Sequence, residues 1–342
     1  MPHLTPWQDH HGSFFTGAKI LITGGAGFIG SHLSEALIEL GAEVVVLDDL
    51  SGGDIANLGP FRQRAGERLS FVEGSLLDQD LLAKIAPGCR FIYHQAAWGS
   101  VPRSVEMPRH YHETNTTGTL NVLEAAREAG VQRVMFAASS SAYGDSPTLP
   151  KIEDMPVRPK SPYAATKVAG EALMRAYAGC YGLDTVSLRY FNIFGPRQNA
   201  NSAYAAVIAA FAKALLAGER PRIHGDGEQS RDFTFVENAV QANLLAARAE
   251  QPLGGEVLNV ACGGKITVNE LAEKMAAILG RSDLTAEHGP ERAGDVKHSL
   301  AELSKTQAAI GYEPVVDFDR GLEVTTRWYE QTMGQDTPAA QR

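Results

Sequence analysis

The sequence is poor in cysteine, in long apolar runs and in basic residues relative to acidic ones. Its three cysteines, Cys89, Cys180 and Cys262, lie far apart and form no CxxC pair. Such an odd and scattered set argues against a disulfide framework or a metal site, and it is typical of a protein from a reducing cytoplasm. No apolar run approaches the roughly 18 residues of a spanning helix, so we predict no membrane segment.

The charge balance and the N-terminus exclude further classes. Asp and Glu total 40 against 31 Lys and Arg, a net charge of −9, which argues against nucleic acid or an anionic membrane as the main partner. A local basic pocket for a small anion is still compatible with this charge. Residues 1–19 have neither a basic flank nor an apolar centre, so they do not resemble a secretory signal. We therefore predict a cytoplasmic protein.

What the sequence does contain is a regular alternation of strand and helix patterns. Short apolar runs rich in Val and Ile predict fully buried strands, and one-sided apolar patterns predict the helices between them. The predicted strands are Lys19–Thr23, Glu43–Leu47, Leu69–Val72, Phe91–His94, Val134–Ala137 and Thr185–Arg189, and the predicted helices include one that Gly30 opens, one closed by Glu124–Ala129, and Tyr163–Tyr181. This order predicts an α/β fold with a doubly wound parallel sheet of the Rossmann type.

The length of 342 residues, about twice that of one compact domain, predicts two domains. The strand–helix rhythm changes after Asn192, where Ala203–Leu216 and Val268–Leu279 predict two further helices. We expect a first domain over 17–191, joined by part of 235–262, and a smaller C-terminal α/β substrate domain over 192–330. Residues 1–16 and 333–342 are expected to be poorly ordered.

Three glycines at three-residue spacing follow the first strand, in Thr23–Gly30 (TGGAGFIG). Gly24 permits a sharp turn, and Gly27 lets the backbone approach a pyrophosphate at the helix N-terminus. Gly30 allows the helix to pack closely on the strand. The pattern predicts a dinucleotide site, although glycines also mark ordinary tight turns.

An acidic residue completes this pattern. Asp48 ends the second predicted strand, where a carboxylate can accept hydrogen bonds from both ribose hydroxyls of an adenosine. The same charge would repel a 2′-phosphate, so NAD is favoured over NADP. Asp49 is adjacent and could share this role, but Asp48 is the favoured residue.

The segment Ser161–Lys167 (SPYAATK) predicts the start of a helix, with Ser161 as its N-cap and Pro162 at its first position. Tyr163 and Lys167 then lie one turn apart on the same face. A neighbouring ammonium favours the phenolate, so Tyr163 is a candidate general base and Lys167 a candidate ligand of the nicotinamide ribose. The alternative is a buried aromatic residue beside a surface lysine.

Serines follow the strand Val134–Ala137 directly, in SSSAYG. Strand ends at this edge of the sheet face the ligand crevice. A hydroxyl there can bridge a substrate oxygen and a tyrosine, and can pass on the hydrogen bond as the proton leaves. The alternative is a plain serine-rich turn.

Taken together, these motifs resemble the extended short-chain dehydrogenase/reductases. Among them, the sequence is most similar to nucleotide-sugar C4 epimerases, nearest to UDP-N-acetylglucosamine 4-epimerases. The resemblance covers residues 19–329. It is carried by TGGAGFIG, HQAAWGSVPRS, SSSAYGD, SPYAATK, LRYFNIFGPRQ, GDGEQSRDFTFVEN and RAGDVKHS.

The resemblance implies the site residues. It makes Ser139 the catalytic hydroxyl, four residues before Tyr143, with Ser140 or Ser141 as one-step alternatives, beside Tyr163 and Lys167. The implied cofactor contacts are Gly24, Gly27, Phe28, Ile29, Gly30, Asp48, Ser75, Leu76, Ala96, Ala97, Thr114, Tyr163, Lys167 and Tyr190. The implied substrate contacts are Gly99, Ser100, Ser139, Ser140, Asn192, Ala206, Val207, Arg231, Arg292 and Ser299.

Some of these positions carry specific expectations. Many relatives place Asp where this chain has Ser75, so the adenine contact is expected to pass to the Ser75 hydroxyl or to the Leu76 backbone. Arg231 and Arg292 resemble two arginines that grip a diphosphate, which suits guanidinium forks, with solvated surface charges as the alternative. Ser299 stands where strictly non-acetylated relatives carry a tyrosine.

The reaction that the resemblance implies is NAD-dependent, reversible C4 epimerisation of UDP-hexoses through a 4-keto sugar. The expected substrates are UDP-GlcNAc and UDP-GalNAc, and also UDP-Glc and UDP-Gal. The alternatives are a strict UDP-glucose 4-epimerase, a nucleotide-sugar 4,6-dehydratase and a non-catalytic NAD-sensing protein. The dehydratase is disfavoured because Ser140 and Ser141 stand where such relatives place Asp-Glu.

The resemblance also implies a homodimer. It would form by packing the helix around Thr114–Ala129 against the helix Tyr163–Tyr181. Apolar positions on these helices, such as Leu120, Leu123 and Leu173, could equally be internal core.

Overall fold

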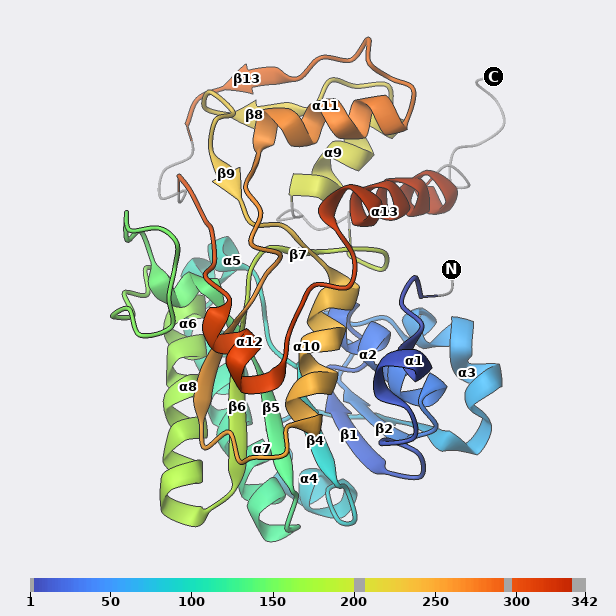
Figure 1. Ribbon diagram of the computed structural model, residues 1–342, viewed down its shortest axis with the longest axis vertical. Helices are drawn as coiled ribbons and strands as arrows, with labels where there is room; N and C mark the ends of the chain where they lie inside the picture. Colours follow the sequence, from blue (N-terminus) through green and yellow to red (C-terminus); the bar gives the residue numbers. More distant parts are fainter. Residues whose placement is uncertain (1–2, 200–206, 292–296, 334–342) are drawn as a thin grey trace.

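A seven-stranded parallel sheet lies at the centre of the computed structural model, which describes residues 3–199, 207–291 and 297–333 (Figure 1). The strands are β1 (Lys19–Thr23), β2 (Glu43–Asp48), β3 (Leu69–Glu73), β4 (Phe91–His94), β5 (Arg133–Ser139), β6 (Asp184–Tyr190) and β11 (Glu256–Val260). Their order is β11-β6-β5-β4-β1-β2-β3. The predicted doubly wound α/β fold is confirmed. The order reverses between β1 and β4, the switch point at which such sheets bind ligands.

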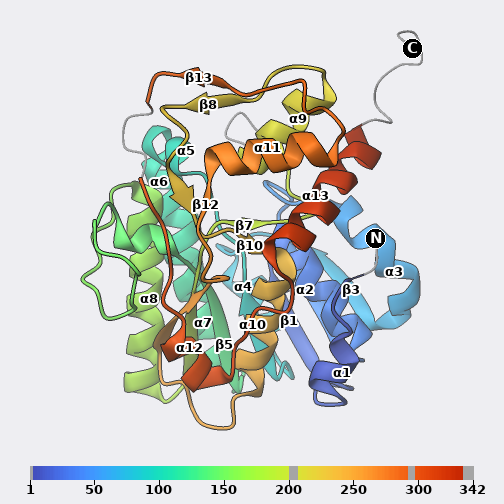
Figure 2. The same cartoon turned by 45° about the horizontal axis from the view of Figure 1, so that its top comes forward.

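Helices cover both faces of the sheet, as Figures 1 and 2 show. The helices α2 (Phe28–Glu39), α3 (Gly59–Ala65) and α10 (Val236–Arg248) share one core cluster. The helices α4 (Gln79–Ile85), α7 (Gly118–Glu128) and α8 (Pro162–Tyr181) share the other. In β1, Ile20 and Ile22 face the first cluster and Leu21 faces the second. Burial on both sides explains why the strand is a continuous apolar run.

A second layer lies beyond the carboxyl end of the sheet, at the top of Figure 1. It consists of α9 (Val207–Leu216), α11 (Val268–Ile278), α13 (Phe318–Met333), β8 (Arg222–His224) and β13 (Glu287–Gly289). These elements share a core of their own, which includes Phe211, Leu271, Met275, Leu322 and Tyr329. The helices predicted at 203–216 and 268–279 correspond to α9 and α11, and residues 203–206 lie outside the described part of the chain. The division into two domains at residue 191 stays a prediction.

Short elements connect these layers. They are α1 (Trp7–His11), α5 (Val101–Glu106), α6 (Pro108–His112), α12 (Ser304–Ile310), β7 (Ile193–Phe194), β9 (Ser230–Arg231), β10 (Thr234–Phe235) and β12 (Ile266–Thr267), with single turns η1 (Ile55–Leu58), η2 (Gly66–Arg68), η3 (Glu113–Thr117) and η4 (Ser140–Tyr143). Within the described residues, no helix has both the length and the apolar character needed to cross a membrane.

Two expectations about the N-terminal region were wrong. Residues 3–16 are not poorly ordered: Trp7 and Phe15 are buried in the main core, and Thr5 donates hydrogen bonds to Glu237 on α10. Two large apolar side chains gain more from this burial than the short segment loses in chain entropy. In addition, α2 begins at Phe28 rather than Gly30, because Gly27 already serves as its extended N-cap. Residues 334–342 lie outside the described part.

Candidate active site

The carboxyl ends of the parallel strands form a cleft at the switch point between β1 and β4. Register brings these ends together, since Thr23 on β1 pairs with His94 on β4, and Ser139 on β5 pairs with Tyr190 on β6. Most of the predicted cofactor residues line this cleft: Gly24, Gly27, Phe28, Ile29, Gly30, Asp48, Leu76, Ala96, Ala97, Thr114, Tyr163, Lys167 and Tyr190.

The glycine turn forms the floor of the cleft and is too tight for side chains. Gly24 has a φ of 70°, and a Cβ there would lie 2.7 Å from the Ala96 backbone. A Cβ on Gly30 would lie 2.1 Å from the Gly24 carbonyl oxygen. The N-terminus of α2, whose N-cap is Gly27, therefore opens directly on the cleft. A bare backbone at a helix N-terminus fits the pyrophosphate of NAD.

Asp48 is held at one end of the cleft by backbone donors. Its carboxylate accepts hydrogen bonds from the Ala26 N–H at 3.0 Å and the Leu50 N–H at 2.9 Å. Burial raises the pKa of Asp48, and these backbone donors oppose the rise. The exposed Asp49 also lines the cleft and accepts a hydrogen bond from Ser51 N–H at 2.9 Å. Asp48 stays the favoured ribose ligand because its position is fixed.

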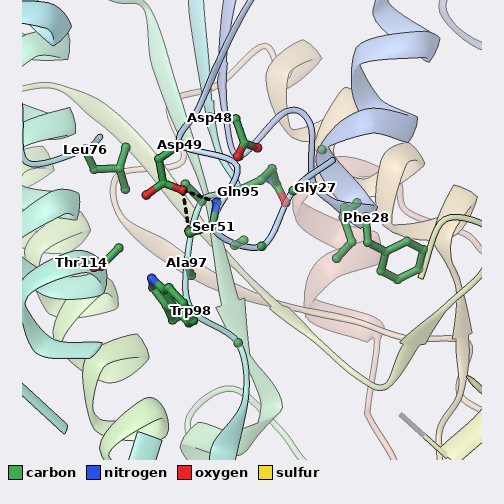
Figure 3. Close-up of a pocket in the computed structure, with 18 of the residues that line it drawn as sticks. Gly27, Phe28, Asp48, Asp49, Ser51, Leu76, Gln95, Ala97, Trp98 and Thr114 are labelled. Atoms are coloured by element: carbon green, nitrogen blue, oxygen red, sulfur yellow. Dashed lines mark hydrogen bonds between the residues drawn. The ribbon is translucent and has the colours of Figure 1, made fainter. Parts of the chain in front are cut away.

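Figure 3 shows how the two walls face each other, with Leu76 and Thr114 across the cleft from Gly27 and Phe28. Ser75 is not among the residues that line the cleft, and its cofactor contact stays a prediction. Its hydroxyl accepts a hydrogen bond from the Leu77 N–H at 3.2 Å, within its own turn, and Leu76 lines the cleft instead. Of the two predicted adenine contacts, the structure favours the one through Leu76.

The first turn of α8 and the end of β5 bring the predicted catalytic groups together. Ser161 caps α8 by accepting a hydrogen bond from the Ala164 N–H at 3.1 Å, as expected. This orients Tyr163, whose phenol lies close enough to the Ser139 hydroxyl for that hydroxyl to lower the pKa of Tyr163. The Lys167 ammonium donates to the Ala137 carbonyl at 2.7 Å and lies 5.9 Å from the Tyr163 ring centroid.

The pKa values of Tyr163 and Lys167 are both shifted by burial. Burial raises the pKa of Tyr163, while the Ser139 hydrogen bond works in the opposite direction. Burial also lowers the pKa of Lys167 to about 7, opposed by the carboxylate of Glu171. Desolvation therefore sets the direction of both shifts in the chain without its cofactor. The expectation that Lys167 and the positive nicotinamide ring together favour the phenolate stays a prediction.

Among the three serines of the motif, the geometry favours Ser139. Its oxygen accepts hydrogen bonds from the Ser141 N–H at 3.2 Å and from the Ser141 hydroxyl at 2.9 Å. Because its oxygen accepts from Ser141, Ser139 keeps its own hydroxyl hydrogen available to donate. Ser140 begins the turn η4, and its substrate contact stays a prediction.

Three of the predicted substrate residues, Asn192, Arg231 and Ser299, lie outside the lining of this cleft as the structure describes it. Asn192 has a φ of 40°, and its amide donates to the Asp232 carbonyl at 3.1 Å. Arg231 donates to the Ser230 carbonyl at 3.0 Å, and the Ser299 N–H donates to the same carbonyl at 3.0 Å. Pairing of residues 297–299 with β9 therefore places Ser299 beside Arg231.

The remaining substrate candidates divide into three groups. Gly99 lines the cleft, whereas the Ser100 hydroxyl caps α5 by accepting from the Arg103 N–H at 3.3 Å. Val207 is the first residue of α9. Ala206 and Arg292 lie outside the described residues.

Gln95 and Trp98 are among the cleft residues that the sequence reasoning missed. Gln95 accepts a hydrogen bond from the Tyr190 hydroxyl at 3.1 Å and so fixes that side chain. The Arg103 guanidinium lies 4.2 Å from the centroid of the Trp98 ring. The Asn115 side chain accepts a hydrogen bond from the Trp98 N–H and donates one to the Trp98 carbonyl. Both cleft residues lie within the motif HQAAWGSVPRS, which directly follows a predicted strand. This position at a strand end could have indicated that they line the cleft.

Comparisons with known proteins identify the family of this chain. Residues 20–261 match the model of the NAD dependent epimerase/dehydratase family. A UDP-glucose 4-epimerase of Mycolicibacterium smegmatis is 40% identical over 91% of this chain and 98% of its own. A dTDP-glucose 4,6-dehydratase of Streptomyces niveus is 35% identical over 91% of this chain and 92% of its own. The solved structure of a UDP-N-acetylglucosamine 4-epimerase from Methanobrevibacter ruminantium M1, in complex with UDP-N-acetylmuramic acid, is 41% identical, with a TM-score of 0.87 over 92% of this chain and 99% of its own.

The doubly wound sheet, the glycine turn and the Ser/Tyr/Lys group define an NAD-binding enzyme of the extended short-chain dehydrogenase/reductase class. The chain belongs to the NAD dependent epimerase/dehydratase family. It is an isomerase that uses NAD and acts on nucleotide sugars.

Proposed function

We propose that the enzyme reversibly epimerises UDP-hexoses at C4, taking UDP-GlcNAc and UDP-GalNAc and also UDP-Glc and UDP-Gal. The observation that carries this proposal is that Tyr163 and Lys167 line one cleft with the predicted NAD residues, with Ser139 at the end of β5 beside Tyr163. The 4-hydroxyl of a sugar that reaches this pair meets both a proton acceptor and a hydrogen-bond partner.

In the proposed mechanism, NAD supplies the hydride acceptor that C4 oxidation requires and the hydride donor for the return. Tyr163 takes the proton of the 4-hydroxyl and later gives it back, with the Ser139 hydroxyl bridging substrate and phenol. Because burial raises the pKa of Tyr163, its phenolate form needs positive charge nearby. A shift from about 10 to about 7 corresponds to roughly 4 kcal/mol. Lys167 supplies one such charge from the next helical turn.

Substrate binding is proposed to depend on three polar or charged side chains. Arg231 and Arg292 would hold the diphosphate through guanidinium forks, with Asn192 at the end of β6. The related epimerase structure from Methanobrevibacter ruminantium contains a UDP-sugar, which supports a uridine diphosphate rather than another nucleotide. After oxidation, the 4-keto sugar would rotate about this fixed anchor and present its other face to Tyr163.

The main rival is a 4,6-dehydratase, because one relative carries that name. Elimination of water between C5 and C6 needs an acid and a base beside the keto group. Ser140 and Ser141 follow Ser139 in this chain, and neither is an acid. The residues therefore favour epimerisation.

The test is to incubate purified enzyme with UDP-GlcNAc, UDP-Glc and dTDP-glucose separately, and to resolve the products by chromatography. We expect UDP-GalNAc and UDP-Gal to form without added cofactor, because each cycle restores NAD and the enzyme retains it. Acid extraction should release NAD rather than NADP. A 4-keto-6-deoxy product from dTDP-glucose, with no epimer of either UDP-sugar, would refute the proposal in favour of the dehydratase.

We also propose a homodimer formed through α7 and α8. Leu120 and Tyr181 are large apolar or aromatic side chains that these helices leave exposed, whereas Leu123 is internal core. Light scattering at micromolar concentration should give twice the 36.7 kDa of one chain. A value near one chain mass would refute the dimer.

A cytoplasmic location stays a proposal that rests on the cysteine pattern.

A further inference from the structure

A buried ion pair lies one helical turn beyond Lys167. Glu171 on α8 and Arg189 on β6 are joined by two parallel hydrogen bonds, Nε to Oε1 at 2.8 Å and Nη2 to Oε2 at 2.7 Å. The side chains are only 7% and 3% exposed, respectively. Neither residue belongs to the cleft lining as far as the structure describes it, so no direct substrate contact accounts for the pair.

The pair affects the charge of Lys167 without lining the cleft. The titratable groups around Lys167 are Tyr163 and Glu171 on α8, His94 on β4 and, through Glu171, Arg189 on β6. Burial lowers the pKa of His94 to about 3, so this imidazole is neutral and cannot balance the ammonium. The Glu171 carboxylate is thus the negative charge that favours protonated Lys167.

The same pair reaches the serine turn. The Arg189 guanidinium lies 4.6 Å from the ring centroid of Tyr143, the last residue of η4. The Tyr143 hydroxyl donates to Asn259 Oδ1 on β11 at 2.6 Å. The turn that follows Ser139 is therefore anchored on two neighbouring strands, β6 and β11.

We propose that Glu171 and Arg189 are positioning residues for the epimerase reaction, which keep Lys167 charged and fix the turn that presents Ser139. The proposal rests on the function given above, because it assigns the pair to the same catalytic group. One ion pair thus joins α8, which carries Tyr163 and Lys167, to β6, whose Arg189 also contacts the turn that follows Ser139.

The chain offers a matched control at the opposite end of the same strands. Arg133, the first residue of β5, pairs with Asp184, the first residue of β6, at 2.5 Å. Arg133 is also 3% exposed and donates to the Ala246 carbonyl at 2.7 Å. Loss of either buried pair is expected to destabilise the fold. Only the pair at the carboxyl end lies beside Lys167.

The experiment compares Glu171→Gln, Glu171→Asp and Asp184→Asn with the wild type. Three properties are measured against pH: the NAD retained after gel filtration, kcat/KM for UDP-GlcNAc, and the midpoint of thermal unfolding. Deprotonation of Lys167 should cause an alkaline loss of NAD retention and of activity. In Glu171→Gln this loss should move to lower pH by about one unit, since a lost neighbouring charge lowers a lysine pKa.

The controls separate positioning from structure. Glu171→Asp retains the charge and should keep the wild-type pH dependence, although packing is lost. Asp184→Asn should lower the unfolding midpoint without moving the alkaline limb. The proposal would be overturned if the alkaline loss of NAD retention and activity stayed at the same pH in Glu171→Gln. An equal movement of that loss in Asp184→Asn would also overturn it.

Two further measurements keep the test decisive. Should Glu171→Gln fail to fold, the double variant Glu171→Leu/Arg189→Met replaces the pair by apolar side chains. It removes the carboxylate together with the opposing guanidinium, so the alkaline loss should move in the same direction by a smaller amount. A wild type that retains NAD but epimerises no UDP-sugar would refute the proposed function alone. The pH dependence of NAD retention would then still decide the role of the pair.

Discussion

The cofactor cleft and the second layer place their site residues in different ways. In the cleft, many residues sit within a few positions of the end of a parallel strand, as Asp48 does on β2 and Ser139 on β5. In the second layer, taken together with the β9 connection that leads into it, Arg231 and Ser299 are neighbours because residues 297–299 pair with β9, nearly 70 positions earlier. The cleft holds the groups of a reaction common to many sugars, and the second layer holds groups that would select among them.

This contrast makes a general prediction. Substitutions in the cleft should reduce turnover of every substrate together, because they alter the shared chemistry. Substitutions in the second layer should change the ratio between substrates.

The largest effect is expected from Tyr163→Phe in the cleft. The variant loses the hydroxyl that moves the proton, so kcat should fall by about 10²–10⁴ for all four UDP-sugars. NAD content and the unfolding midpoint should stay at wild-type values. Tyr181→Phe is the matched control, because that tyrosine ends the same helix and is 58% exposed. A variant that keeps a tenth of wild-type turnover would remove Tyr163 from the role of base.

A smaller effect on turnover, with loss of cofactor, is expected from Gly30→Ala. The added Cβ would lie 2.1 Å from the Gly24 carbonyl oxygen, so the turn must open. Overpacking of this kind costs about 1–3 kcal/mol, and the displaced turn should release NAD. Calorimetry and acid extraction of NAD measure both effects. Gly179→Ala on α8, where the Cβ would meet nothing within 4 Å, should change neither. Full NAD content in Gly30→Ala would contradict the role of this turn.

The most selective effect is expected from Ser299→Tyr in the second layer. A tyrosine would fill the space that an N-acetyl group at C2 needs, so kcat/KM for UDP-GlcNAc and UDP-GalNAc should fall by at least about tenfold. The plain pair should be largely spared. Ser299→Ala removes the hydroxyl without adding bulk and should leave the ratio unchanged. Equal losses on acetylated and plain sugars in Ser299→Tyr would show that Ser299 is not the gate and would break the contrast between the two regions.

Much of the cleft could be predicted from the sequence because its signals are local. The glycine turn, the Ser161 cap and the one-turn spacing of Tyr163 and Lys167 all depend on residues within a few positions of one another. The N-terminal segment could not be predicted in this way. Trp7 and Phe15 are buried by a surface assembled from distant helices, and a local pattern of polar and aromatic residues does not reveal such a surface.

The sequence by itself determined the fold class, the family and the residue types of the catalytic group. Backbone turns, caps and strand-to-helix alternation follow from short-range sterics and hydrogen bonding, which act before the chain has packed.

Only the tertiary structure decided which serine contacts Tyr163, that the hydroxyl of Ser75 is used in its own turn, and that Glu171 stands behind Lys167 paired with Arg189. It also decided the direction of the pKa shifts of Tyr163 and Lys167. Desolvation and charge interactions depend on everything packed around a group, and much of that packing comes from parts of the chain far away in the sequence.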